Sequence, residues 1–87
     1  MATLASDFYP KAVLHEAAGL SASIYRCFGQ QGEYFMTNFA RTFEYDGQIY
    51  VTDLFRHEHL LPLSHLAQRA YVRIKMLEAK KPVESAR

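Results

Sequence analysis

The feature that most constrains this chain is the Asp46-Gly47 pair, which separates two apolar runs. Residues 34–45 and 48–55, on either side of it, are rich in aromatic and β-branched side chains. An Asp-Gly pair in that setting is one of the strongest short-range signals for a β-hairpin with a two-residue turn. Such a turn also fixes the register of the two strands. The predicted cross-strand pairs are Tyr45 with Gln48, Phe43 with Tyr50, Arg41 with Thr52, and Phe39 with Leu54.

A further strand is predicted before the hairpin. Residues 21–28 have a strand-like pattern, and Gly29-Gln30-Gln31-Gly32 is a polar turn with a glycine at each end, which suits a hairpin loop. We therefore expect residues 21–55 to form a three-stranded antiparallel meander. Residues 1–20 are ambiguous, because the stretch around residues 11–18 fits either two helical turns or a further strand. In the second case the sheet has four strands.

A long C-terminal helix is predicted after the meander. Pro62 is tolerated only in the first turn of a helix, where its missing N–H would have no intrahelical partner, so the helix begins between about His57 and Leu61. We expect the helix over residues 58–80, with a frayed tail over residues 82–87 after Pro82. Its apolar stripe has the 3.6-residue period and consists of Leu63, Leu66, Ala67, Ala70, Tyr71, Ile74 and Leu77.

The length of the chain indicates one α+β domain over residues 1–87. A chain of this size has a thin core, and small domains often compensate by forming oligomers. The single cysteine, Cys27, excludes a disulfide within the chain and suits a reducing cytoplasm. We expect it to be a small buried side chain of a strand, in preference to a reactive thiol.

The charge pattern does not indicate a dedicated nucleic-acid binder, because ten basic and nine acidic side chains give a net charge of +1. No apolar run approaches the length needed to cross a bilayer. The N-terminal residues lack the basic stretch and apolar segment of a signal peptide. The expected location is therefore the cytoplasm, with no membrane partner.

Both faces of the predicted meander carry apolar side chains. One face carries the candidate interaction residues Phe35, Phe39, Arg41, Phe43 and Tyr50, and the other carries residues that include Met36, Ile49, Val51 and Phe55. One amphipathic helix covers one face of a three-stranded sheet, so the second face needs another cover. An exposed aromatic sheet face usually marks an interaction surface. We therefore predict a homodimer that uses the aromatic face.

Arg41 supports a second hypothesis. An arginine among aromatic side chains on a sheet can bind phosphate while bases stack on its neighbours, as in modules that bind single-stranded nucleic acid. In the structural alternative, Arg41 forms an ion pair with Asp7, Glu16 or Glu33. A modest basic patch is also possible, formed by Arg69, Arg73 and Lys80 on one side of the helix together with Arg26 and Arg56.

No catalytic constellation is recognisable in the sequence, so an enzyme is not expected. His57, His59 and His65 cluster near the predicted helix start, but their spacing is not the i, i+4 pair typical of metal ligands on one helix. We expect them to be solvated histidines. No metal, cofactor or small-molecule substrate is predicted.

Residues 19–74 resemble a family of small uncharacterised bacterial proteins that are often carried by phages, plasmids and integrated elements. The similarity rests on Ser23-Ile24-Tyr25, Gly32-Glu33-Tyr34-Phe35, Arg41 with Phe43, Leu60-Leu61-Pro62-Leu63, and Ala70-Tyr71-Val72-Arg73-Ile74. This chain departs from the family pattern at Tyr25 and Val72-Arg73, where a tryptophan is usual, and at His57-Glu58-His59, where acidic residues are usual. The resemblance implies the same architecture and a mobile-element context, and it implies no activity.

Overall fold

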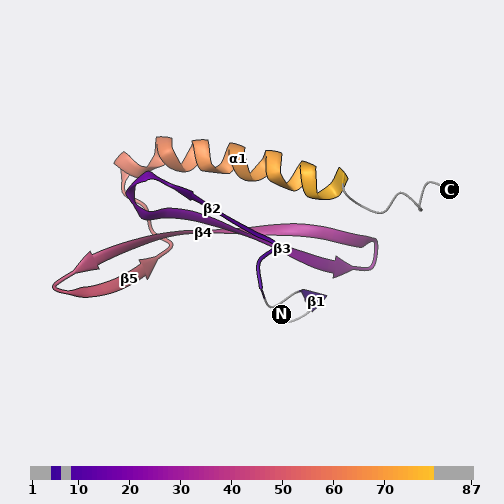
Figure 1. Cartoon of the computed structure of the whole chain (residues 1–87), viewed down its shortest axis with the longest axis horizontal. Coiled ribbons are helices and arrows are strands. Elements are labelled where there is room, and N and C mark those ends of the chain that lie inside the picture. The colour runs from indigo at the N-terminus through magenta and orange to yellow at the C-terminus, as the bar shows by residue number, and fades with distance from the viewer. Residues whose placement is uncertain (1–4, 7–8, 80–87) are drawn as a thin grey trace.

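The computed structural model describes residues 5–6 and 9–79 and confirms the predicted α+β architecture, an antiparallel sheet packed against one long C-terminal helix (Figure 1). Its elements in chain order are β1 (Ala5–Ser6), β2 (Ala12–Glu16), a 3₁₀ turn η1 (Ala17–Gly19), β3 (Leu20–Gly29), β4 (Gly32–Tyr45), β5 (Gln48–Thr52), a 3₁₀ turn η2 (His57–His59) and α1 (Leu60–Ala79). The predicted tail over residues 82–87 lies outside the described residues.

The sheet is antiparallel throughout and follows the order β1-β3-β4-β5, with β2 also paired to β3. Because β1 and β2 pair with different parts of β3, they lie end to end along the same edge, and the sheet is four strands wide. Three of the four predicted hairpin pairs are confirmed: Tyr45 with Gln48, Phe43 with Tyr50, and Arg41 with Thr52.

The fourth predicted pair, Phe39 with Leu54, does not form, because β5 ends at Thr52. The Leu54 N–H donates a hydrogen bond to Thr52 Oγ1 at 3.0 Å. A threonine hydroxyl that bonds the backbone two residues on offers the chain an alternative to the strand ladder. The predicted strand over residues 48–55 is therefore three residues too long.

Part of the ambiguous N-terminal stretch forms a strand, β2, which is followed by the 3₁₀ turn η1. β2 pairs with β3 through five consecutive residue pairs, from Ala12 with Ile24 to Glu16 with Leu20. The helical preference of Ala12 gives way to this pairing, because Leu14, in the middle of β2, is buried in the core of the protein. Strand pairing and burial of one side chain thus outweigh the helical propensity of Ala12.

Gly19 permits the tight connection between β2 and β3. Its φ is +75°, a conformation that favours glycine. A Cβ atom at this position would overlap the carbonyl oxygen of Thr42 in β4. The connection therefore needs a residue without a side chain for two independent reasons.

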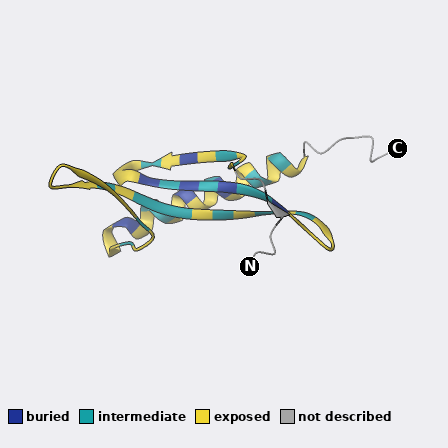
Figure 2. Cartoon of the chain, turned by 90° about the horizontal axis from the view of Figure 1, so that it is seen from below, coloured by how far each residue is buried: buried dark blue, intermediate teal, exposed yellow. Residues whose placement is uncertain are grey.

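Helix α1 packs mainly against β2 and β3 and forms the second layer of the fold (Figure 2). Leu66 and Ala70 are its buried residues. The buried stripe of α1 is narrower than the predicted one. Leu63, Ile74 and Leu77 are partly buried beside the core, whereas Ala67 and Tyr71 are exposed.

The core lies between α1 and one face of the sheet. Its buried members are Leu14, Leu20, Ala22, Ile24, Leu66 and Ala70. Cys27 of β3 is 1% exposed, which confirms its predicted burial, but it is not a member of this core. The core is thus small and is restricted to the strands beneath the helix.

The β4–β5 hairpin extends beyond the end of the helix as a two-stranded arm (Figure 1). The molecule is consequently elongated, with extents of 56 × 27 × 19 Å and a radius of gyration of 15.5 Å. A compact chain of this length has a radius of gyration of about 12 Å. Within the described residues, no helix combines the length and apolar character that crossing a membrane requires.

The packing of α1 predicts a strong contrast between two leucines of the helix. Leu66 is fully buried between the helix and the sheet, so replacing it with alanine should destabilise the fold by about 2–5 kcal/mol. The control, Leu61→Ala, removes a side chain that is 80% exposed and should change the free energy of unfolding by less than about 0.5 kcal/mol. Urea denaturation followed by circular dichroism measures both values. Equal effects of the two changes would contradict the described packing.

Candidate functional site

The structure divides the predicted interaction residues into two groups on the same face of the sheet. Phe35 and Phe39 pack against the core beneath α1 and are partly buried, so only part of each side chain is accessible to a partner. Arg41, Phe43 and Tyr50 lie further along the strands, on the part of the face that leads into the hairpin arm. The aromatic face thus contracts to a three-residue surface, which we call the arginine–aromatic row.

The row is an ordered stack. The guanidinium carbon of Arg41 lies 4.8 Å from the centroid of the Phe43 ring, a cation–π distance. Across the strands, the centroids of Phe43 and Tyr50 are 5.5 Å apart, with 23° between the ring planes. Tyr50 is 42% exposed, and Arg41 and Phe43 are partly exposed. The row therefore presents a cation and two aromatic faces from neighbouring strands.

Arg41 does not form the ion pairs predicted for it with Glu16 and Glu33. Glu16 binds residues of α1, and Glu33 lies near Arg26, with 3.7 Å between Arg26 Nε and Glu33 Oε2. Asp7, the third predicted partner, lies outside the described residues. The Nε atom of Arg41 is buried without a hydrogen-bond partner, so its described contact is with Phe43.

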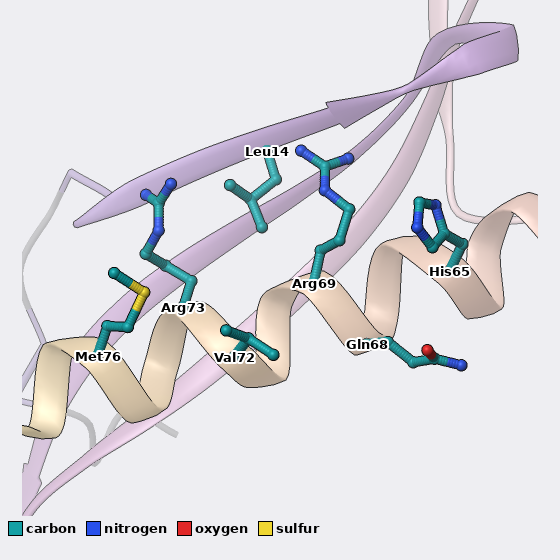
Figure 3. A pocket seen from close by; sticks show the side chains of 7 residues that line it. All are labelled: Leu14, His65, Gln68, Arg69, Val72, Arg73 and Met76. Carbon is teal, nitrogen blue, oxygen red and sulfur yellow. The ribbon is translucent and has the colours of Figure 1, made fainter.

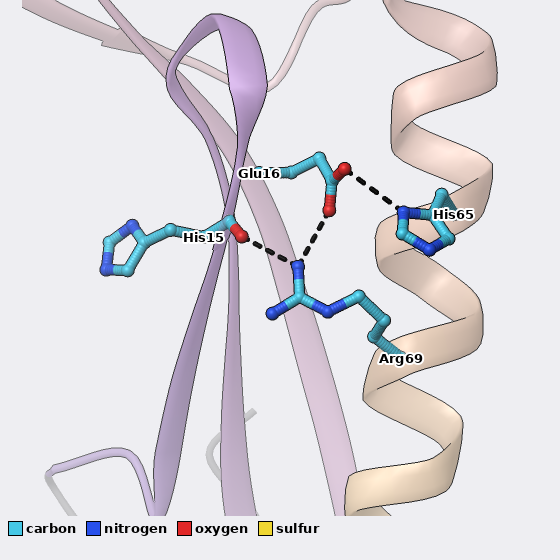
Figure 4. A network of polar contacts seen from close by, with 4 residues as sticks. All are labelled: His15, Glu16, His65 and Arg69. Atoms are coloured by element: carbon cyan, nitrogen blue, oxygen red, sulfur yellow. Dashed lines mark hydrogen bonds and ion pairs between the residues drawn. The ribbon is translucent and has the colours of Figure 1, made fainter.

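A polar network joins α1 to the edge strand β2 (Figure 4). Arg69 Nη1 donates hydrogen bonds to Glu16 Oε1 and to the His15 carbonyl oxygen, both at 2.7 Å. His65 Nδ1 lies 3.1 Å from Glu16 Oε2. The hydrogen bonds from His65 and Arg69 hold the pKa of the Glu16 carboxyl below its usual value, because they stabilise its ionised form.

A groove runs beside this network, between α1 and β2 (Figure 3). It has a volume of about 390 Å³. Leu14 projects from β2 toward the helix, and Arg69 and Arg73 reach from the helix on either side of it. Val72 and Met76 add apolar surface to the same flank of the helix. The groove is therefore apolar along its middle and carries basic side chains along the sheet edge.

The three predicted histidines have three different environments. His57 is exposed, as predicted. His59 is buried and its Nδ1 accepts a hydrogen bond from the Arg56 N–H at 3.3 Å, so the prediction of a solvated side chain is wrong for it. His65 belongs to the polar network. No group of three His, Cys, Asp or Glu side chains within residues 5–6 and 9–79 converges as metal ligands do.

Ion pairs neutralise three of the arginines in the predicted basic patch. Arg56 Nε lies 3.1 Å from Glu58 Oε2, Arg26 lies near Glu33, and Arg69 is bound by Glu16. Lys80 lies outside the described residues. Arg73, on the groove, makes no ion pair with another described residue.

The comparisons with known proteins add no relative. No protein family, no curated protein and no solved structure was found that matches the chain. The site must therefore be interpreted from its own geometry.

Sequence reasoning grouped the row correctly on one face, because the hairpin register sorts its residues. It missed the polar network, whose partners Glu16 and Arg69 are 53 positions apart. The only available signal was indirect. If residues 11–18 had been assigned to a strand, Glu16 would have become a candidate partner for a basic residue on the helix.

The lowered pKa of Glu16 predicts acid-labile docking of the helix. A carboxyl whose pKa is lower in the folded protein than in the unfolded chain stabilises the fold at pH values above the unfolded pKa, which is near 4.5. This stabilisation is lost as the pH falls through the pKa of the folded state. The wild type should therefore lose melting temperature more steeply than Glu16→Gln when the pH is lowered from neutral to below 4.5. The control is Glu44→Gln on the exposed part of β4. Thermal melts that superpose for wild type and Glu16→Gln at every pH would contradict a role for the network.

Proposed function

We propose that this chain is a small non-enzymatic interaction module that works as a homodimer. The proposal rests on how its polar residues are used. Glu16, His65 and Arg69 are occupied in joining the helix to the sheet, and Arg41 is stacked on Phe43. These side chains support a scaffold and a binding surface better than they support a reaction.

The observation that carries the assignment to an interaction module is the amount of apolar surface that α1 leaves uncovered. Tyr45, Ile49 and Val51 of the hairpin arm are each between 66% and 69% exposed. On the sheet face opposite the helix, Met36 is also exposed. A two-stranded ribbon is at best marginally stable in water by itself, so an arm with apolar side chains favours a partner.

A second copy of the chain is the partner that this size favours. Domains this small often gain stability by oligomerisation, and the core here is confined to the strands beneath one helix. The arginine–aromatic row by itself is too small for the contact, because a stable interface buries about 800 Å² on each partner. The mobile-element context predicted from the sequence resemblance remains part of the proposal.

The homodimer predicts a defined mass in solution. Sedimentation equilibrium at a chain concentration of about tens of micromolar should give twice the chain mass of 10.0 kDa. The concentration dependence should fit a monomer–dimer equilibrium. A single species with the mass of the monomer over the whole concentration range would overturn the proposal.

A second candidate function is binding of single-stranded nucleic acid, and the arginine–aromatic row is the specific observation that favours it. Bases stack on exposed aromatic side chains of sheets, and an arginine beside them can bind phosphate. Arg41, Phe43 and Tyr50 have this composition and geometry. In this alternative the dimer is the scaffold and the row is the ligand site.

Fluorescence anisotropy with a labelled single-stranded oligonucleotide tests the second function. Binding at low salt should weaken as salt is raised, since phosphate contacts release counterions. Tyr50→Ala should weaken it by about 1–3 kcal/mol if a base stacks there. Tyr9→Ala is the matched control, because Tyr9 is an exposed tyrosine away from the row. Absence of binding at low salt removes this candidate.

A further inference from the structure

The outer edge of β2 is open for strand pairing. Both β1 and β2 lie on one side of β3, and no strand of the described residues pairs with the other side of β2. Natural edge strands are commonly protected by proline, lysine or a bulge. Here Pro10 and Lys11 precede the strand, while its middle carries Val13, which is β-branched and exposed.

The direction of the open backbone groups follows from the polar network. The His15 carbonyl oxygen accepts a hydrogen bond from Arg69, so it is directed away from β3 (Figure 4). Backbone groups alternate in direction along a strand of an antiparallel pair. Val13 therefore shares the outward direction of His15, and the groups of Leu14 are directed at β3. The edge offers the N–H groups of Val13 and His15 and the Val13 carbonyl oxygen, one position on each side of Leu14. The His15 carbonyl oxygen already accepts the bond from Arg69, which leaves it one lone pair for a further donor.

We propose, on the basis of the homodimer above, that two copies of this chain pair through the outer edges of β2, antiparallel and centred on Leu14. In this register, the His15 N–H of one copy donates to the Val13 carbonyl oxygen of the other, and the Val13 N–H donates to the remaining lone pair of the His15 oxygen, beside its bond from Arg69. The two Leu14 side chains meet at the two-fold axis, on the helix side of the sheet. The result is one continuous sheet, eight strands wide because each copy contributes a width of four. The hairpin arms lie at its two outer ends, so this dimer leaves their apolar side chains available to a further partner.

The groove supplies the apolar part of this contact. It lies along the same edge, on the side to which Leu14 projects, and it exposes Val72 and Met76 of α1 (Figure 3). The two-fold axis brings the grooves of the two copies together above the paired strands. Val72 and Met76 of both copies then cover one another beside Leu14, which is already buried in its own chain, so the edge contact also buries apolar surface of the helix.

Charge complementarity favours a second copy of the chain as the occupant. Arg69 reaches His15 and Glu16, and Arg73, one helical turn further, lies on the other side of Leu14 (Figure 3). Pairing centred on Leu14 places Glu16 of one copy opposite Ala12 of the other, near Arg73 of that copy. Arg73 makes no ion pair with another described residue. In the dimer it would share the Glu16 carboxylate of the other copy, whose oxygens keep acceptor positions beside their bonds to Arg69 and His65, and the two-fold axis makes this contact twice.

A mixed-cysteine experiment tests the register. Residues 13 and 15 would form a hydrogen-bonded pair, whose Cα separation of about 5.5 Å suits a disulfide. An equimolar mixture of Val13→Cys and His15→Cys chains should therefore form a covalent dimer under mild oxidation. Each variant alone should form little, because equivalent residues lie diagonally, about 7–8 Å or more apart. The wild type, whose Cys27 is buried, is the control.

A charge reversal tests the contact without changing the core. Arg73→Glu should weaken dimer association about tenfold, equivalent to about 1.4 kcal/mol. Lys75→Glu makes the same change in charge on an exposed residue that does not line the groove, and it should leave association unchanged. Circular dichroism melts of both variants show that the monomer fold is intact.

The outcomes separate the two proposals. Cross-linking of the mixture together with a selective effect of Arg73→Glu supports pairing through β2. If association is unchanged by Arg73→Glu and the cysteine mixture does not cross-link, the edge contact is wrong, but the proposed homodimer is not affected. A wild-type protein that is monomeric at all concentrations overturns both the homodimer and the edge contact. This holds also if the edge of β2 then pairs with an extended segment of another protein.

Discussion

The packing of one helical stripe on two strands determines the rest of this structure. Leu66 and Ala70 of α1 are buried against the side chains that β2 and β3 present, and the core extends little beyond them. Because a single helix is narrower than a sheet four strands wide, this packing leaves the β4–β5 side of the helix-facing surface uncovered. It also places the flank of the helix beside the open edge of β2. Both candidate surfaces are thus consequences of where one stripe docks.

The parts of the fold that depend on local chemistry were predictable from the sequence. Asp46-Gly47 fixed the turn and three cross-strand pairs, and Pro62 fixed the region in which the helix starts. The parts that depend on long-range pairing were not. Ala12 has a helical preference that only the contact with β3 overrides. The narrowing of the buried helical stripe depends on how α1 lies on the sheet, and the periodicity of the sequence does not specify this.

The candidate site shows the same division. The register grouped Arg41, Phe43 and Tyr50 on one face, and the structure adds the stack between their side chains. Which sheet face the helix covers could not be predicted, because both faces carry apolar side chains, and this choice removes Phe35 and Phe39 from the available surface. The network of Glu16, His65 and Arg69 joins segments distant in sequence, so no local pattern indicates it.

The central claim is that the open edge of β2 pairs with a second copy, and amide hydrogen exchange tests it most directly. The Leu14 amide, directed at β3, should be protected at every protein concentration. The Val13 and His15 amides should be protected at high concentration and should exchange freely on dilution below the dissociation constant. Rapid exchange of Val13 and His15 at all concentrations, beside a protected Leu14, would contradict the account.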